Sequence, residues 1–201
     1  MITGWRIIRG GRGAGWSFAA GTVLALLLPI GAGAEAKATV SLVEVAVAAH
    51  DMPRLEASLT IEAPIDEVWA LVSDCTRFGD FMSDIDSARL LWRRKEKTRC
   101  RLVVDVPFPF GSLENVSDAV AERQPGLYRQ SWKLVTGDFH YDEGFWELRS
   151  TAHGHTLVRY VSLVEPKLPV PRGLLLSGQK DYVLDMLQRL RQTAIRAARP
   201  R

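Results

Sequence analysis

Between residues 87 and 165 the chain alternates stretches of strand-forming residues with short turn sequences. The stretches cover residues 87–93, 100–106, 113–122, 127–135, 139–149 and 156–165. The turns between them include Lys95-Glu96-Lys97, Gln124-Pro125-Gly126, Gly137-Asp138 and His153-Gly154-His155. Such short connections bring neighbouring strands together as antiparallel pairs. This run therefore predicts one antiparallel sheet whose strands follow one another along the chain.

A long helix is predicted after the strands. Pro166, Pro169 and Pro171 end the sheet, and residues 172–198 contain no further proline. Apolar residues recur in this segment at helical spacing, namely at Val183, Leu187, Leu190 and Ala194. The segment therefore predicts one amphipathic helix with a face that packs against the sheet.

Two short helices are predicted before the strand run. Residues 54–61 suit a strand, which Pro64 closes. The spacing of one helical face then occurs twice, at Ile65, Val68, Trp69 and Val72 and again at Phe78, Phe81, Met82 and Ile85. We therefore expect one short helix after Pro64 and a second one close behind it.

These elements predict an α+β fold. We expect a curved antiparallel sheet of about six or seven strands wrapped around the long C-terminal helix, with the two short helices after the first core strand. One face of such a sheet must be covered, and the final helix is the only element long enough to cover it. The space between a curved sheet and one helix is the default site for a ligand.

Residues 1–34 have the pattern of a secretory signal peptide. Arg6, Arg9 and Arg12 supply a positive start, and residues 23–30 are mostly apolar. Ala32-Gly33-Ala34 then matches the small-residue pattern that signal peptidase accepts. We expect cleavage near Ala34 and a periplasmic or secreted mature protein. The alternative is an uncleaved membrane anchor, although the segment is short for a membrane span.

The remaining chain divides into two parts. Residues 35–53 form an N-terminal extension in which residues 40–47 suit an extra strand, and residues 54–198 form the ligand-binding domain. Three of the 26 basic residues precede Glu35, the first acidic residue, which leaves 23 basic residues against 23 acidic ones. A nucleic-acid-binding protein needs a basic surface, and this balance gives no support for one. The hydrophobic share of 47% excludes a mainly disordered chain.

In the order of its motifs the chain resembles the START-like superfamily, also called SRPBCC or helix-grip proteins. This superfamily includes polyketide cyclases/dehydrases, plant Bet v 1-type proteins and coenzyme Q-binding proteins. The resemblance covers residues 54–198 and rests on residues 61–69, 78–82, 137–139 and 143–148, followed by Thr156, Tyr160, the proline-rich linker and the long helix. It implies a helix-grip fold with a cavity for an apolar molecule such as a lipid, a sterol-like compound or a quinone.

Large aromatic and sulfur-containing side chains are the candidates for the cavity wall. Each of them alone could equally be part of a packed core, but as a set they favour a cavity. The predicted ligand-binding residues are Trp69, Phe81, Phe108, Trp132, Trp146, Tyr160, Tyr182 and Met186.

Catalytic and metal-binding motifs are absent from the sequence. It has no nucleophile motif, no phosphate-binding glycine loop and no cofactor signature, so we predict no cofactor. His153 and His155 could form a metal-binding pair on one strand face, but a solvated turn fits better because no third ligand follows at a suitable spacing. Strand alternation places His140 on the face of Asp142 and Trp146, where acid–base chemistry would be feasible.

Two further features concern partners and oxidation state. The basic hairpin tip with Arg93, Arg94, Lys95 and Lys97 suits either a solvated edge or transient contact with an anionic membrane surface. Cys75 and Cys100 are expected to stay unpaired. The strand between them would separate their Cα atoms by more than the roughly 7 Å that a disulfide allows, unless the second short helix folds back along that strand.

Three functions are compatible with these observations. The first is an exported binding protein for an apolar small molecule, and the second is a cyclase or dehydratase on the same fold. The third is a protein-interaction module with a filled core. An enzyme needs a convergent acid–base pair inside the cavity, and the inward-facing residues are mostly apolar or aromatic. The sequence therefore favours the binding protein.

Overall fold

The computed structural model describes residues 39–106 and 110–199. Its elements in chain order are β1 (Ser41–Val45), β2 (Arg54–Ile61), α1 (Ile65–Val72), the 3₁₀ helix η1 (Cys75–Asp80), β3 (Ile85–Arg94), β4 (Lys97–Val106), β5 (Gly111–Gln124), β6 (Leu127–Gly137), β7 (Phe139–Ser150), β8 (Thr156–Pro166) and α2 (Arg172–Ala198). The predicted leader over residues 1–34 lies outside the described residues. Within the described part, no helix combines the length and the apolar character that a membrane span requires.

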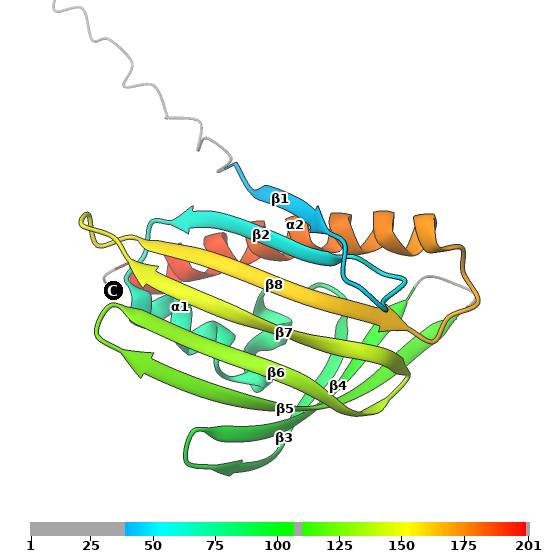
Figure 1. Ribbon diagram of the computed structural model, residues 1–201. Helices are drawn as coiled ribbons and strands as arrows, with labels where there is room; N and C mark the ends of the chain where they lie inside the picture. Colours follow the sequence, from blue (N-terminus) through cyan, green and yellow to red (C-terminus); the bar gives the residue numbers. More distant parts are fainter. Residues whose placement is uncertain (1–38, 107–109, 200–201) are drawn as a thin grey trace, which may run out of the picture. The chain divides into compact units, whose positions relative to one another are not determined.

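The eight strands form one antiparallel sheet in the order β1-β2-β8-β7-β6-β5-β4-β3. Strands β3 to β8 pair with their neighbours in sequence, as the short turns require, and β8 then pairs with β2. β1, which lies within the predicted extra strand, adds an outer strand beside β2. Figure 1 shows this curved, unclosed sheet with α2 lying along one face. The predicted α+β architecture is confirmed.

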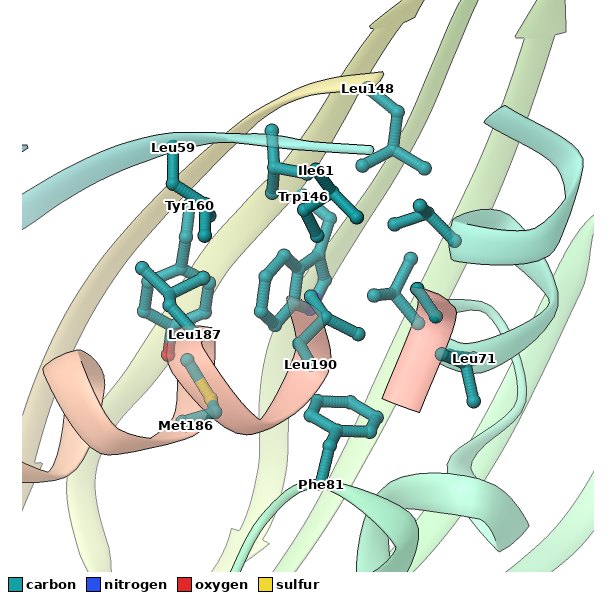
Figure 2. Packing of buried hydrophobic residues seen from close by; sticks show 14 of the residues in the cluster. Leu59, Ile61, Leu71, Phe81, Trp146, Leu148, Tyr160, Met186, Leu187 and Leu190 are labelled. Carbon is teal, nitrogen blue, oxygen red and sulfur yellow. The ribbon is translucent and has the colours of Figure 1, made fainter. Parts of the chain in front are cut away.

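Only the C-terminal half of α2 packs tightly against the sheet. Its buried residues are Val183, Met186, Leu187, Leu190 and Ala194. Figure 2 shows Trp146 and Tyr160 reaching from the sheet toward Met186 and Leu187. Truncation of a fully buried leucine such as Leu190 to alanine costs about 2–5 kcal/mol of stability. In contrast, Leu174 near the start of the helix is 65% exposed. The sheet is therefore covered tightly at one end only.

The first short helix forms as the sequence predicts. Pro64 precedes it, and Asp66 lies in its first turn, where the helix dipole favours an acidic group. Its buried residues include Val68 and Trp69, so the predicted apolar face points into the core. The Tyr128 hydroxyl donates a hydrogen bond of 2.9 Å to the Asp66 carboxylate and ties α1 to β6.

The second short helix begins at Cys75, as expected, but it differs from the prediction in type and in where it ends. It is a 3₁₀ helix that ends at Asp80, and the Asp74 carboxylate caps its start by accepting a hydrogen bond from the backbone N–H of Thr76. Phe81 and Met82 are buried after its end, and the chain enters β3 at Ile85. The apolar spacing therefore predicted the burial of Phe81 and Met82 correctly, but it did not correspond to an α-helix.

The expectation that Cys75 and Cys100 stay unpaired is wrong. The two residues form a disulfide with a Cα–Cα distance of 6.4 Å. η1 folds back along β3, and Cys100 on β4 lies opposite Leu90 in the middle of the β3–β4 pair. Cys75 therefore lies against the middle of this strand pair, and the length of β3 does not separate the two cysteines.

The disulfide should contribute substantially to stability. It links residues 25 positions apart, and closing a loop of that length in the unfolded chain is worth about 3.5 kcal/mol. We expect the free energy of unfolding of the Cys75→Ser/Cys100→Ser variant to be lower by that amount, as measured by denaturant unfolding followed by circular dichroism. Thiol titration of the denatured, unreduced protein should find no free thiol, and two free thiols would contradict the pairing.

Candidate functional site

A cavity of about 580 Å³ lies between the sheet and the loosely covered half of α2. The inner faces of β4 and β5 supply apolar residues such as Leu102, Val104 and Leu113. The helix supplies Leu175 and Tyr182. The cavity exists because residues 172–182 of α2 include no buried side chain that reaches down to the sheet.

Four of the eight predicted ligand-binding residues line this cavity. They are Trp132, Trp146, Tyr160 and Tyr182. Trp132 and Tyr160 stack with their ring centroids 5.7 Å apart. The ring centroids of Trp146 and Tyr160 are 4.4 Å apart. These three rings on β6, β7 and β8 form a continuous aromatic wall between the cavity and the packed core.

The other predicted residues lie elsewhere. Trp69, Phe81 and Met186 belong to the packed core and are not among the lining residues. Trp69 packs edge-on against Tyr128 at 5.4 Å, and Met186 lies one turn beyond Tyr182 on the tightly packed part of α2. Phe108 lies outside the described residues. Trp69, Phe81 and Met186 are therefore core residues, which is the alternative that the sequence left open for each of them.

A polar cluster interrupts the apolar wall. Asp142 on β7 lines the cavity and accepts two hydrogen bonds through its carboxylate. Trp132 Nε1 donates to Oδ1 over 2.7 Å, and Asn115 Nδ2 donates to Oδ2. Three neighbouring strands therefore converge on one carboxylate, which is held in place from both sides.

Gly144 makes this arrangement possible. It lies opposite Trp132 in the pairing of β6 with β7. A Cβ atom at position 144 would approach Trp132 Cζ2 to 2.6 Å and would collide with the carbonyl oxygen of Val161. The absence of a side chain therefore lets the indole lie across β7, where its N–H reaches Asp142 two residues away.

Burial changes the proton affinity of the acidic and phenolic groups in the cavity. Burial raises the pKa of Asp142 to about 6, and the hydrogen bonds from Trp132 and Asn115 oppose this change only in part. Burial also raises the pKa values of Tyr160 and Tyr182, so both hydroxyls stay protonated near neutral pH. Asp142 is therefore the group in this cluster that can exchange a proton near neutral pH.

The histidines do not join this cluster. His140 is exposed, because the pairing of β7 with β8 shifts in register between Phe139 and Tyr141. The prediction that His140 shares the inner face with Asp142 is therefore wrong, although Asp142 and Trp146 do share it. His153 and His155 lie in the turn between β7 and β8 with ring centroids 6.4 Å apart. Among the described residues, no three acidic, histidine or cysteine side chains form a metal-binding group.

The basic hairpin tip lies between β3 and β4. Arg93 approaches Asp74 to 4.0 Å, and the Arg94 guanidinium lies 5.9 Å from the ring centre of Trp92. Lys95 has a positive φ of 51° in the turn. These contacts fit a solvated edge that charge protects from pairing. Contact of this tip with a membrane surface stays a prediction.

Sequence reasoning missed the polar half of the cavity wall. Asn115 and Gln130 line the cavity but were not among the predicted site residues, and Asp142 was predicted only to share a strand face with Trp146. A signal was present for β5, where Asn115 alternates in phase with the inward-facing Leu113 and out of phase with the charged Glu114. Gln130 lies two residues before the inward-facing Trp132 on β6, so strand alternation also indicates that Gln130 faces inward.

The carboxyl group of Asp142 should make stability depend on pH. Because its pKa is raised in the folded state, the folded protein binds this proton more tightly than the unfolded chain does. The wild type therefore loses stability relative to Asp142→Asn as the pH rises from about 4 through about 6, by about 1–3 kcal/mol in total. Thermal melts of both proteins from pH 4 to pH 8 measure this difference. A difference in melting temperature that stays constant over this range would contradict the assignment.

Comparisons with known proteins agree with this architecture. A profile of the family described as "Polyketide cyclase / dehydrase and lipid transport" matches residues 61–191. Two Streptomyces proteins are named provisionally as polyketide cyclases. The one from Streptomyces cyaneus is 31% identical over 100 residues, which is 49% of this chain and 64% of that protein. The one from Streptomyces halstedii is 30% identical over 107 residues, which is 53% of this chain and 95% of that protein.

A solved structure shows the same fold. The STAR-related lipid transfer protein from Xanthomonas axonopodis superposes with a TM-score of 0.68 at 17% identity, over 79% of this chain and 93% of that one. At this identity the likeness concerns the fold alone. The family match, which spans most of the sheet and most of α2, carries the assignment: the chain belongs to the polyketide cyclase/dehydrase and lipid transport family.

Proposed function

We propose that this chain is an exported protein that binds an apolar small molecule, such as a lipid, a sterol-like compound or a quinone, in the cavity between the sheet and α2. The observation that carries the proposal is the cavity of about 580 Å³ with its aromatic wall. An interaction module with a filled core would leave no such space. The family description includes lipid transport, which supports the same function.

The size of the expected affinity follows from the apolar wall. A ligand that buries about 300 Å² of apolar surface gains about 7 kcal/mol at 25 cal/mol per Å². Association costs offset part of this gain, so binding in the micromolar range or weaker is the reasonable expectation. Such an affinity suits a protein that takes up a ligand and releases it again.

Export is supported by the disulfide as well as by the leader pattern. Disulfides persist mainly in oxidising compartments, and Cys75 and Cys100 form one. This supports removal of residues 1–34 and a location outside the cytoplasm. N-terminal sequencing of the exported protein should find a start near Glu35. A mature protein that still begins at Met1 in the membrane fraction would contradict export with cleavage.

A cyclase or dehydratase is the second candidate, and Asp142 is the observation that favours it. A carboxyl group with a pKa of about 6 in an apolar cavity can act as a general acid or base. Its immediate partners, Asn115 and Trp132, only donate hydrogen bonds to it and do not titrate near neutral pH. The cluster around Asp142 therefore offers one proton-exchanging group where this class of reaction asks for a convergent pair, and the binding function takes precedence.

Filling the mouth of the cavity should weaken binding. Gly178 on α2 lines the cavity one turn from both Leu174 and Tyr182, and a Cβ built there meets no atom within 4 Å. Gly178→Phe should therefore place its ring in the ligand space without disturbing the helix. We expect the dissociation constant for Nile red, a neutral apolar dye, to rise on the order of tenfold, as measured by dye fluorescence.

Gly173→Phe is the matched control for this variant. Gly173 lies on the same helix with equally open space around it, but it is not a lining residue. The Gly173→Phe variant should bind Nile red with a dissociation constant within about twofold of that of the wild type. Equal weakening by both substitutions, or by neither, would contradict binding in this cavity.

A further inference from the structure

The charged side chains that line the cavity are all acidic. They are Asp84, Asp105 and Asp142. Among the described residues, no lysine, arginine or histidine lines this space. Asp84 and Asp105 lie near each other, where the backbone N–H of Asp105 donates to the carbonyl of Asp84 over 2.7 Å. The cavity therefore presents negative charge at two places and no compensating cation.

Asp142 still has unused acceptor capacity. Each of its carboxylate oxygens accepts one hydrogen bond, from Trp132 and from Asn115. A carboxylate offers about four acceptor positions, so further donors can be accommodated. Neither partner carries a positive charge, and the carboxylate is therefore held by dipoles without an ion pair. A donor on a bound molecule would add a favourable interaction that the protein itself does not supply.

Two amide oxygens in the cavity wall also lack a donor. Asn115 and Gln130 are 1% and 6% exposed, and both line the cavity. Asn115 Oδ1 and Gln130 Oε1 have no hydrogen-bond partner. The orientation of the Asn115 amide is fixed, because its NH₂ group must face the Asp142 carboxylate. Buried acceptors without donors are costly, so each of these oxygens would gain from a donor on a bound molecule.

We propose that the cavity selects apolar molecules that carry a hydrogen-bond-donating hydroxyl or amine group and rejects those that end in an acid group. The donor group lies at the Asp142 carboxylate and the neighbouring Asn115 amide oxygen, and the apolar body lies along the aromatic wall. This selectivity rests on the proposed function, because it requires an apolar ligand in this cavity.

The physical basis is the behaviour of charge away from water. An ionised acid group placed near the Asp142 carboxylate loses its hydration and meets a like charge, and both effects oppose binding. A hydroxyl group avoids these costs and supplies the missing donor. An amine in its ammonium form also supplies a donor and adds attraction to the carboxylate. Ester and ketone groups only accept hydrogen bonds and gain nothing from the cluster.

Competition between matched ligands tests the selectivity. Dodecan-1-ol, dodecylamine, methyl dodecanoate and sodium dodecanoate share one chain length and differ in their end group. Each would displace Nile red from the mature protein at pH 8, below its micellar concentration. We expect the alcohol and the amine to bind on the order of tenfold more tightly than dodecanoate, with the methyl ester between them.

Asp142→Asn should remove much of this selectivity. The substitution keeps the shape of the side chain and removes the charge. The ratio of the dissociation constants of dodecanoate and dodecan-1-ol, which is the selectivity gap, should therefore fall below about threefold. Asp86→Asn is the matched control, because Asp86 is exposed on β3, is not a lining residue and carries the same charge. The gap should be unchanged in this control. Thermal melts of both variants check that they are folded.

A second measurement needs no variant. Carbon-detected NMR of the Asp142 carboxyl group should show its pKa falling when dodecylamine binds and staying in place when the methyl ester binds. Dodecanoate binding as tightly as dodecan-1-ol, or a gap that survives in Asp142→Asn, would overturn the selectivity while leaving the binding function intact. If neither Nile red nor any of the compounds binds, the proposed function fails and the selectivity fails with it.

Discussion

The contact between the C-terminal half of α2 and the inner face of β2, β7 and β8 determines what the rest of this structure can do. Leu187 and Leu190 are fully buried there, against Trp146 and Tyr160. The same helix continues beyond Tyr182 toward its N-terminus without a comparable contact. One helix thus closes one end of the sheet as a packed core and leaves a cavity at the other end. The part of α2 that stabilises the fold and the part that borders the ligand space are therefore different segments of one helix.

The aromatic wall marks the boundary between these two regions. Trp146 and Tyr160 belong to the packed core and also line the cavity. Trp132 belongs to the wall on the cavity side, where Gly144 gives its indole room and Asp142 accepts its N–H. Because the rings are fixed by packing behind them, the cavity wall is preorganised, and a ligand need not pay for ordering it. The disulfide at Cys75 fixes η1 at the other side of the same space.

The parts of the structure that follow from local periodicity could be predicted from the sequence. The alternation between residues 87 and 165 and the apolar spacing of residues 183–194 predicted the sheet and the helix, and both are present. The pairing of Cys75 with Cys100 could not be predicted in this way, because it depends on how η1 folds back in space. The polar cluster was missed for a similar reason, because the pairing of β5, β6 and β7 brings Asn115 and Asp142 together, and the phase of Asn115 with Leu113 indicates only that it faces inward.

Native mass spectrometry tests the central claim most directly, namely that this chain holds an apolar small molecule in the cavity. The mature protein would be purified without detergent from the organism that makes it, and spectra would be recorded before and after extraction with organic solvent. We predict a bound mass that extraction removes and that corresponds to an apolar compound without an acid group. A protein that carries no adduct, and that takes up no compound from the extracted lipids of its own cells, would contradict the claim.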